Sequence, residues 1–213
     1  MNQALGWAMS QPGNWHDSGN LGPQVLKRIH DTASSYKDCV SAETGCGLST
    51  IVLSHAGAHH TSFTIAEGNS LARVRAEPLL RPEGVEFVIG PSQRTLPAHH
   101  FVRPLHVALI DGAHGWPFPE LDYYHLYPHV LPGGTLVVDD IHIPTIARMC
   151  EMLRDDAMWQ HVEDILYTSF FRRTSAPLFD PLGDGWWQQN FNKRHISNPE
   201  SLDPYLGDGW WKV

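Results

Sequence analysis

Short apolar segments alternate with helical segments along the middle of the chain, and this alternation limits the fold more than any other feature. Segment 105–111 is a near-continuous apolar run, typical of a parallel strand buried on both faces. Further strands are predicted at 38–43, 60–66, 85–90 and 135–139, and helices at 21–34, 48–56, 70–80, 118–131 and 143–156. The alternation predicts an α/β fold, a doubly wound and mostly parallel sheet with right-handed crossovers.

The last part of the chain departs from this alternation. Segments 161–166 and 169–173 are expected to pair as a closing antiparallel hairpin. An aromatic C-terminal tail follows, and Leu-Gly-Asp-Gly-Trp-Trp occurs twice in it. Two copies are too few for a solenoid, so we expect the tail to pack on the domain, to join a homo-oligomer, or to cover the site as a lid, with packing on the same chain favoured. The expected organisation is an N-terminal segment 1–20, a domain 21–175 and a tail 176–213.

Composition excludes several classes of protein. With 213 residues, 42% hydrophobic and 18% charged, the chain suits one globular domain with an appendage. A formal net charge of −8 argues against a nucleic-acid partner. No apolar run reaches the ~20 residues of a membrane span, and no signal peptide is recognised. Three cysteines make neither a disulfide framework nor a metal knuckle, so a reduced, cytoplasmic protein is expected.

The first predicted strand ends in an acid and a glycine turn. Glu43 is followed by Gly45, Gly47 and Ser49, directly before a helical segment. Glycine permits a positive φ and removes the Cβ that would block the approach of a ligand to the backbone. We expect the turn to bind a cofactor, with Glu43 contributing at least indirectly. The alternative is that Glu43 only accepts backbone N–H groups of the turn.

The ends of the second and third strands also carry polar residues suited to a nucleoside. Glu67, Gly68 and Asn69 lie about 20 residues past the glycine turn, where an acid can bind both hydroxyls of a ribose. Ser92 and Gln93 follow the third strand and offer a hydroxyl and an amide to an adenine edge. Three neighbouring strand ends therefore suit a nucleoside cofactor.

The ends of the fourth and fifth strands are rich in acids. Asp111 and His114 follow one strand, and Asp139 and Asp140 end the other. Three converging carboxylates repel one another unless a cation, a proton or a base lies between them. If a nucleoside cofactor binds at the first three strand ends, these two remain available for the residues that carry out the reaction.

Several of these segments resemble those of a known family. Segments 64–69 and 90–93 are similar to the ribose- and adenine-binding segments of catechol O-methyltransferase. Segments 110–114 and 132–141 are similar to the Ile-Asp-Gly-x-His and Gly-Gly…acid-Asp-aliphatic segments of bacterial sugar and antibiotic O-methyltransferases. From 21 to 173, the chain thus resembles class I S-adenosylmethionine-dependent methyltransferases of the small-molecule O-methyltransferase type. The glycine turn is one residue shorter than in catechol O-methyltransferase, and Asp140 replaces an asparagine.

The resemblance implies S-adenosylmethionine as the cofactor and a divalent cation, Mg²⁺, held by Asp111, Asp139 and Asp140. A hard cation prefers oxygen ligands and can lower the pKa of a bound hydroxyl. Asp111 is also expected to contact the cofactor and to take part in the reaction. His114 falls where catechol O-methyltransferase has its catalytic lysine, and an imidazole suits a general base. His142 is the alternative base or ligand.

Two other function classes remain open. An NAD-dependent oxidoreductase could use a similar sheet, but Thr50 stands where the third glycine of the dinucleotide motif is expected. A non-catalytic cofactor-binding module could act through its aromatic tail, because a fold alone does not establish an activity.

The acceptor is expected to be a hydroxyl of a sugar-like small molecule or secondary metabolite. Its pocket is expected to draw a wall from Trp7, Trp15 and His16, from segment 116–118 and from the tail. The histidine pairs at 59–60 and 99–100 are expected to be solvated strand ends.

Overall fold

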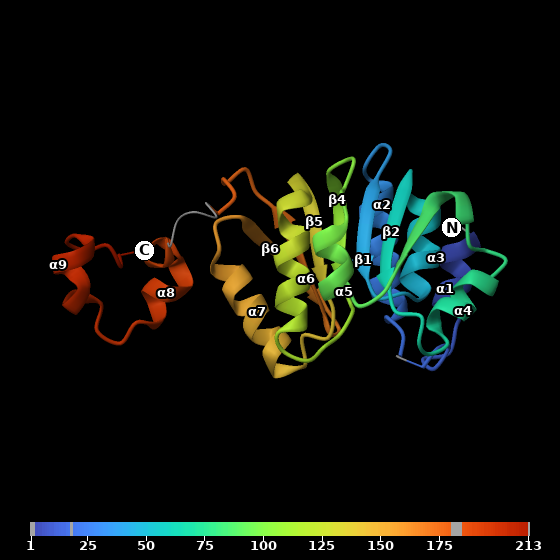
Figure 1. The fold of residues 1–213 in the computed structure, drawn as a ribbon, viewed down its shortest axis with the longest axis horizontal. Helices are drawn as coiled ribbons and strands as arrows, with labels where there is room; N and C mark the ends of the chain where they lie inside the picture. The colour runs from blue at the N-terminus through green and yellow to red at the C-terminus, as the bar shows by residue number, and fades with distance from the viewer. Residues whose placement is uncertain (1–2, 18, 180–184, 213) are drawn as a thin grey trace.

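A single seven-stranded sheet forms the centre of the computed structural model, which describes residues 3–17, 19–179 and 185–212. The strand order is β3-β2-β1-β4-β5-β7-β6, and the first five are parallel. β7 runs antiparallel to both of its neighbours. Figure 1 shows the sheet with the helices packed around it. The strands are β1 (Val40–Thr44), β2 (His59–Thr64), β3 (Val85–Ile89), β4 (Leu105–Ile110), β5 (Val130–Val138), β6 (Trp159–Ile165) and β7 (Thr168–Arg173). The predicted α/β fold with its closing antiparallel hairpin is confirmed.

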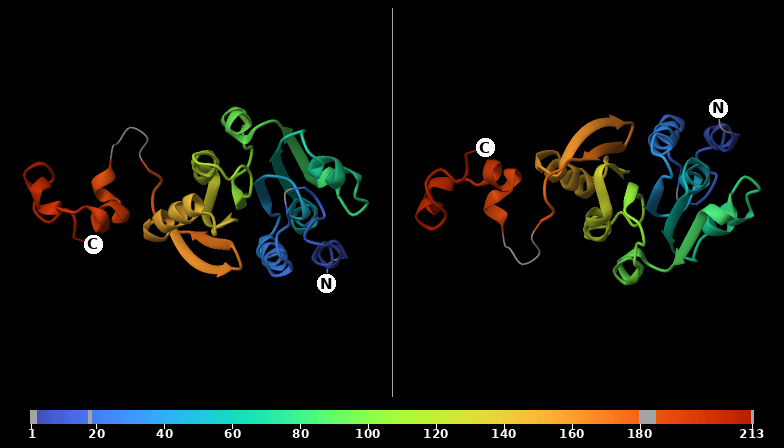
Figure 2. Two further views of the ribbon diagram at one scale, coloured as in Figure 1. Left: turned by 90° about the horizontal axis from the view of Figure 1, so that it is seen from below. Right: turned by 90° about the horizontal axis from the view of Figure 1, so that it is seen from above.

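Helices cover both faces of the sheet, as Figure 2 shows. One layer contains α1 (Gln3–Met9), α2 (Pro23–Ser34), α3 (Leu48–Ala56) and α4 (Ser70–Ala76); the other contains α5 (Ser92–Thr95), α6 (Phe118–Leu126) and α7 (Pro144–Asp155). β4 supplies both cores, because Val107 and Leu109 face the first layer while Ala108 and Ile110 face the second. This explains why its sequence is apolar at successive positions.

The chain reverses its direction of travel across the sheet between β1 and β4. In the sheet, β1 and β4 are neighbours. The connection that follows β1 leads to β2 on one side of this pair, and the connection that follows β4 leads to β5 on the other side. Ligands of doubly wound sheets bind at this point, outside the carboxyl ends of the strands. The fold thereby places the strand ends singled out in the sequence at one edge.

Two helices end earlier in the structure than the sequence predicted. The helix predicted over 118–131 ends at Leu126, and after a 3₁₀ turn, η3 (Tyr127–His129), β5 already begins at Val130. Pro132, Gly133 and Gly134 in isolation favour the end of a helix, but they lie within β5, where the pairing with β4 is irregular and Gly133 adopts φ +84°. Strand pairing with a bulge accommodates them. The helix over 70–80 ends at Ala76, because Pro78 disfavours a helical residue before it.

The prediction that the histidine pair at the start of β2 is solvated was wrong for His60. The His59 side chain is 39% exposed, but that of His60 is completely buried. β2 lies between two strands and under helices on both faces, so only its first residue reaches the surface. His99 is half-buried with its ring edge-on to Phe63, whereas His100 is exposed.

The tail lies beyond α7, at the far end of the molecule from the N-terminal helices (Figure 1). Its described part contains η4 (Trp186–Gln188), α8 (Asn190–His195), η5 (Pro199–Leu202) and α9 (Asp203–Leu206). Arg148 of α7 stacks on Phe191 at 4.7 Å, and Arg194 pairs with Asp155. Residues 180–184, which include the first three residues of the first Leu-Gly-Asp-Gly-Trp-Trp copy, lie outside the described residues. The described tail therefore contacts its own domain through α7.

None of the helices in the described ranges is both long and apolar enough to cross a lipid bilayer.

Candidate functional site

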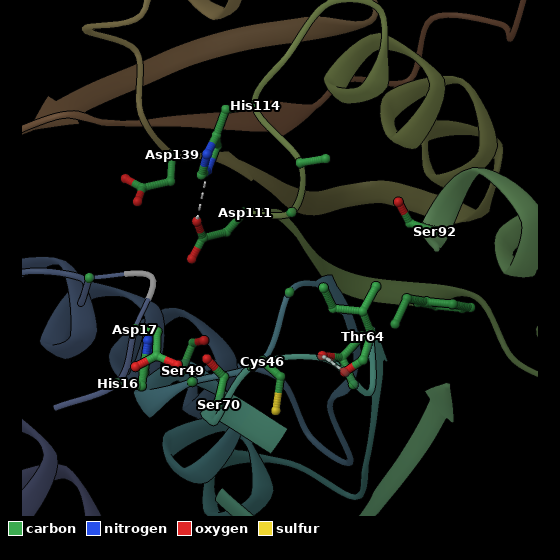
Figure 3. A pocket seen from close by; sticks show the side chains of 18 of the residues that line it. His16, Asp17, Cys46, Ser49, Thr64, Ser70, Ser92, Asp111, His114 and Asp139 are labelled. Carbon is green, nitrogen blue, oxygen red and sulfur yellow. Dashed lines mark hydrogen bonds and ion pairs between the residues drawn. The ribbon is translucent and has the colours of Figure 1, made fainter. Parts of the chain in front are cut away.

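A cavity of about 690 Å³ lies at the carboxyl ends of the parallel strands (Figure 3). Most of the residues singled out in the sequence line it: Gly45, Gly47, Ser49, Glu67, Gly68, Ser92, Gln93, Asp111, His114, Asp139 and Asp140. They come from the loops that follow β1, β2, β3, β4 and β5 and from the first turns of α3 and α5. The topology alone brings them together, since the carboxyl ends of parallel strands meet at one edge. No described residue of the tail is among the lining residues.

Two of the predicted cofactor residues lie outside this lining. Glu43 is 1% exposed, accepts a hydrogen bond from the Thr50 hydroxyl and lies 3.1 Å from His60 Nε2. Asn69 lies directly before α4 and bonds to Asp17. Glu43 thus lies beneath the glycine turn, where it can affect a bound cofactor only through the turn.

The glycine turn is closely packed by other parts of the protein. Gly45 adopts φ +99°, and a Cβ there would overlap the backbone oxygen of Asp111. At Gly47 a Cβ would lie 2.7 Å from His16 Nε2. Both positions therefore require glycine for the turn to pack against the loop after β4 and the N-terminal segment, in addition to any approach of a ligand.

The N-terminal segment supplies four residues to the cavity lining: His16, Asp17, Gly19 and Asn20. Of these, only His16 was expected at a pocket from the sequence. The Asp17 carboxylate accepts bonds from the backbone N–H and side-chain amide of Asn69, whose own amide oxygen accepts the Asp17 N–H. Arg73 of α4 donates to the carbonyl of Trp15. These bonds join residues more than 50 positions apart. They fix this segment between the glycine turn and the loop after β2.

His16 lines the cavity on the side of the glycine turn. Its ring lies against this turn, across the cavity from His114 (Figure 3), and its place in the wall of an acceptor pocket stays a prediction. Burial lowers the pKa of His16 despite the carboxylate of Asp17. A neutral imidazole is therefore favoured at pH 7.

A cluster of three titratable groups occupies the other end of the cavity. His114 Nε2 lies 2.8 Å from Asp140 Oδ2 and 3.9 Å from Asp111 Oδ1. Bonding to these two carboxylates raises the pKa of His114 to about 10. The same contact lowers the pKa of Asp140, whereas burial beside the other carboxyls raises the pKa of Asp111 to about 7. Without another cation, His114 supplies the positive charge between the acids.

The ligand atoms of Asp111, His114 and Asp140 lie within 4.8 Å of one another, a separation that suits one metal ion. The predicted metal ligands were Asp111, Asp139 and Asp140, so two of the three are in this cluster. Asp139 also lines the cavity, but its carboxylate accepts a bond from Thr168 of β7, and burial raises its pKa. Carboxylate oxygens suit Mg²⁺, and an imidazole in the set suits a transition metal better.

His142 lies behind Asp140, outside the cavity lining. Its Nδ1 is 3.6 Å from Asp140 Oδ1, and its ring lies 4.6 Å from that of Tyr167. His114, rather than His142, therefore faces the cavity.

A family model described as a methyltransferase domain matches residues 42–141, which include every strand end of the cavity. The expected resemblance to class I S-adenosylmethionine-dependent methyltransferases is confirmed by this match and by the fold. No curated protein matches the chain.

Solved structures share the fold at low sequence identity. The O-methyltransferase TomG of Streptomyces achromogenes, solved with SAM, is 18% identical with a TM-score of 0.63, over 82% of this chain and 91% of that one. An SAH-bound methyltransferase of Podospora anserina is 14% identical with a TM-score of 0.62, over 82% and 89%. An rRNA methylase of Streptococcus thermophilus is 14% identical with a TM-score of 0.55, over 70% and 95%. Because these proteins differ in their acceptors, the likeness establishes the fold alone.

Proposed function

We propose, from the premise that the chain carries a methyltransferase domain, that it transfers a methyl group from S-adenosylmethionine to a hydroxyl of a small molecule. One observation carries the proposal: a single cavity joins three nucleoside-type strand ends to the cluster of Asp111, His114 and Asp140. A cofactor held at the first three ends would present its methyl group beside the cluster. Alignment of oxygen, methyl carbon and sulfur supplies much of the rate of such a displacement.

The cofactor is assigned to the cavity by the chemistry of its walls. Glu67 is an exposed acid at the cavity and would accept bonds from ribose hydroxyls. Ser92 and Gln93 would meet the adenine edge, and the glycine turn would leave room for the methionine part. His16 and Asp17 would close the cavity over the cofactor from the N-terminal side. S-adenosylmethionine complexes among the structural relatives support this assignment.

His114 is the group best placed to take the proton of the acceptor hydroxyl. With a pKa of about 10, His114 is protonated at pH 7 as long as it lies between the two carboxylates. A protonated imidazole cannot act as a base. A divalent cation held by Asp111 and Asp140 would supply that charge instead and polarise a hydroxyl. His114 would then be neutral and would face the cavity as the base.

The acceptor is proposed to be a sugar-like molecule or secondary metabolite that enters beside the cluster. Trp116 is 71% exposed in the loop that follows His114, and Tyr167 is 60% exposed beside His142. Aromatic faces of this kind stack on sugar rings or planar rings alike.

A methyl-transfer assay tests the proposal. The protein is incubated with S-adenosylmethionine labelled in its methyl group, with and without Mg²⁺, and with catechols and sugars as acceptors. Labelled acceptor and one equivalent of S-adenosylhomocysteine are the expected products. A protein that binds NAD but not S-adenosylmethionine in calorimetry would instead be a dinucleotide enzyme.

A further inference from the structure

A chain of buried polar groups lies beneath the glycine turn, and its innermost member is His60. The His60 ring is completely buried, with Nδ1 2.9 Å from Ser41 Oγ and Nε2 3.1 Å from Glu43 Oε1. Ser41 and Glu43 lie two residues apart on β1, and therefore on one face of it, with Ser41 paired to His60 across the two strands. The chain continues from Glu43 to Thr50, which is also fully buried.

The groups are joined by contacts of two kinds. His60 Nε2 lies at ion-pair distance from Glu43 Oε1 but makes no aligned hydrogen bond to it. His60 Nδ1 shares a hydrogen bond with the Ser41 hydroxyl. Thr50 donates its hydroxyl to Glu43, and the same oxygen accepts the backbone N–H of Gly47 at 3.0 Å. The chain of bonds thus runs from β2 to the turn that lines the cavity.

Glu43 depends on its polar neighbours because it is 1% exposed. A carboxylate removed from water is strongly destabilised unless polar groups surround it. Loss of the His60 ring would leave a void beside the Glu43 carboxylate. The carboxylate and Thr50 would then shift together, and the turn would lose the acceptor that fixes Gly47.

We propose that His60 is a positioning residue of the cofactor site, which acts through Glu43 and Thr50 to fix the glycine turn. The inference rests on the proposed function only for the identity of the ligand. His60 touches neither the cavity nor the cluster of Asp111, His114 and Asp140. Its loss is therefore expected to weaken cofactor binding without slowing the chemical step.

The first test compares His60→Leu with His59→Leu, the adjacent residue whose side chain is outside the chain of bonds. The Kd for S-adenosylmethionine, measured by calorimetry, is expected to rise about tenfold or more in His60→Leu, about 1.4 kcal/mol, and to stay within about twofold in the control. The kcat at saturating cofactor is expected to stay within about threefold in both. His60→Gln keeps an N–H donor and should recover part of the affinity, and it replaces His60→Leu if the latter does not fold.

A double-mutant cycle separates positioning from a general loss of stability. In Glu43→Gln, the carboxylate that His60 contacts is gone, so adding His60→Leu should change Kd by less than about twofold. If His60 has only a structural role, its replacement would lower the melting temperature, and the effects of the two substitutions on the free energy of cofactor binding would be additive. Unchanged affinity in folded His60→Leu, or additive effects in the cycle, overturns the proposal.

Hydrogen exchange at the Gly47 amide gives a readout that needs no cofactor. Exchange at this amide is expected to accelerate at least about tenfold in His60→Leu, while exchange in the α7 helix stays as in the wild type. If the wild-type protein fails to bind S-adenosylmethionine, the proposed function is contradicted, and this exchange still decides the role of His60. Unchanged exchange at Gly47 would overturn it.

Discussion

His114 Nε2 lies 2.8 Å from Asp140 Oδ2, and this contact joins the loop after β4 to the loop after β5 across the mouth of the cavity. Asp140 presents its carboxylate from a left-handed backbone conformation, φ +60°, two residues after the end of β5. Such a conformation is unusual for a residue other than glycine and often marks a functional site. The pair determines which group carries the positive charge at this end of the cavity.

The pKa of His114 is expected to fall when Asp140 becomes neutral. In Asp140→Asn the amide no longer favours the imidazolium, so the pKa should move from about 10 towards its ordinary value of 6.5. NMR titration of the His114 ring signals measures this shift. Glu151→Gln on the surface of α7 serves as the control and should leave the titration unchanged. A pKa that stays near 10 in Asp140→Asn would mean that Asp111 alone holds the proton.

Stability is expected to decrease between neutral and alkaline pH because of the same residue. The folded-state pKa of His114 is raised above its unfolded value of 6.5, so its contribution is fully present below about pH 6.5 and is lost as pH rises through about 10. Urea unfolding at pH 6 and at pH 10.5 measures the difference in free energy of unfolding. His114→Gln should show a smaller difference than the wild type, and an equal difference would refute the assignment.

Removal of divalent cations is expected to abolish methyl transfer and to preserve cofactor binding. EDTA should stop turnover, while calorimetry should still detect S-adenosylmethionine, since the cation serves the acceptor. Asp140→Asn should raise the Mg²⁺ concentration needed for half-maximal activity more than Asp139→Asn does, because the Asp139 carboxylate is already bonded to Thr168. Full activity in EDTA would show that the reaction needs no metal.

Gly47→Ala is expected to reduce both stability and cofactor affinity, for a reason that involves the N-terminal segment. The added Cβ would press on His16 Nε2 and displace that ring. His16→Ala should therefore restore much of the stability in the double variant, which thermal unfolding can measure. Gly13→Ala is the matched control, since no atom lies within 4 Å of a Cβ there and its φ is ordinary. An additive loss in the double variant would mean that His16 is not the obstacle.

The sequence was informative where local pattern and topology agree. The apolar run of β4 and the strand–helix alternation predicted the parallel sheet, and the sheet rule then placed Glu67, Ser92 and Asp111 at one edge. Long-range pairing could not be predicted in the same way. Asp17 and Asn69 lie 52 residues apart, and neither position carries a pattern that announces the other.

Burial of polar residues was also hidden in the sequence. His60 starts β2 beside an exposed histidine, and only the three-dimensional neighbours Ser41 and Glu43 show why it can be buried. The Pro-Gly-Gly at 132–134 favours a helix stop in isolation, but the pairing of β5 with β4 extends the strand through it. In both cases tertiary contacts outweighed the local preference.

The most direct test of the central claim is calorimetric titration of the wild-type protein, Glu67→Ala and the control Glu86→Ala with S-adenosylmethionine. The wild type and the control should bind one equivalent. Glu67→Ala should lose about 1.5–3 kcal/mol of binding free energy, the range for a hydrogen bond to a charged group. If wild-type protein does not bind S-adenosylmethionine, or if Glu67→Ala binds it as tightly as the wild type, the cavity is not the cofactor site described here.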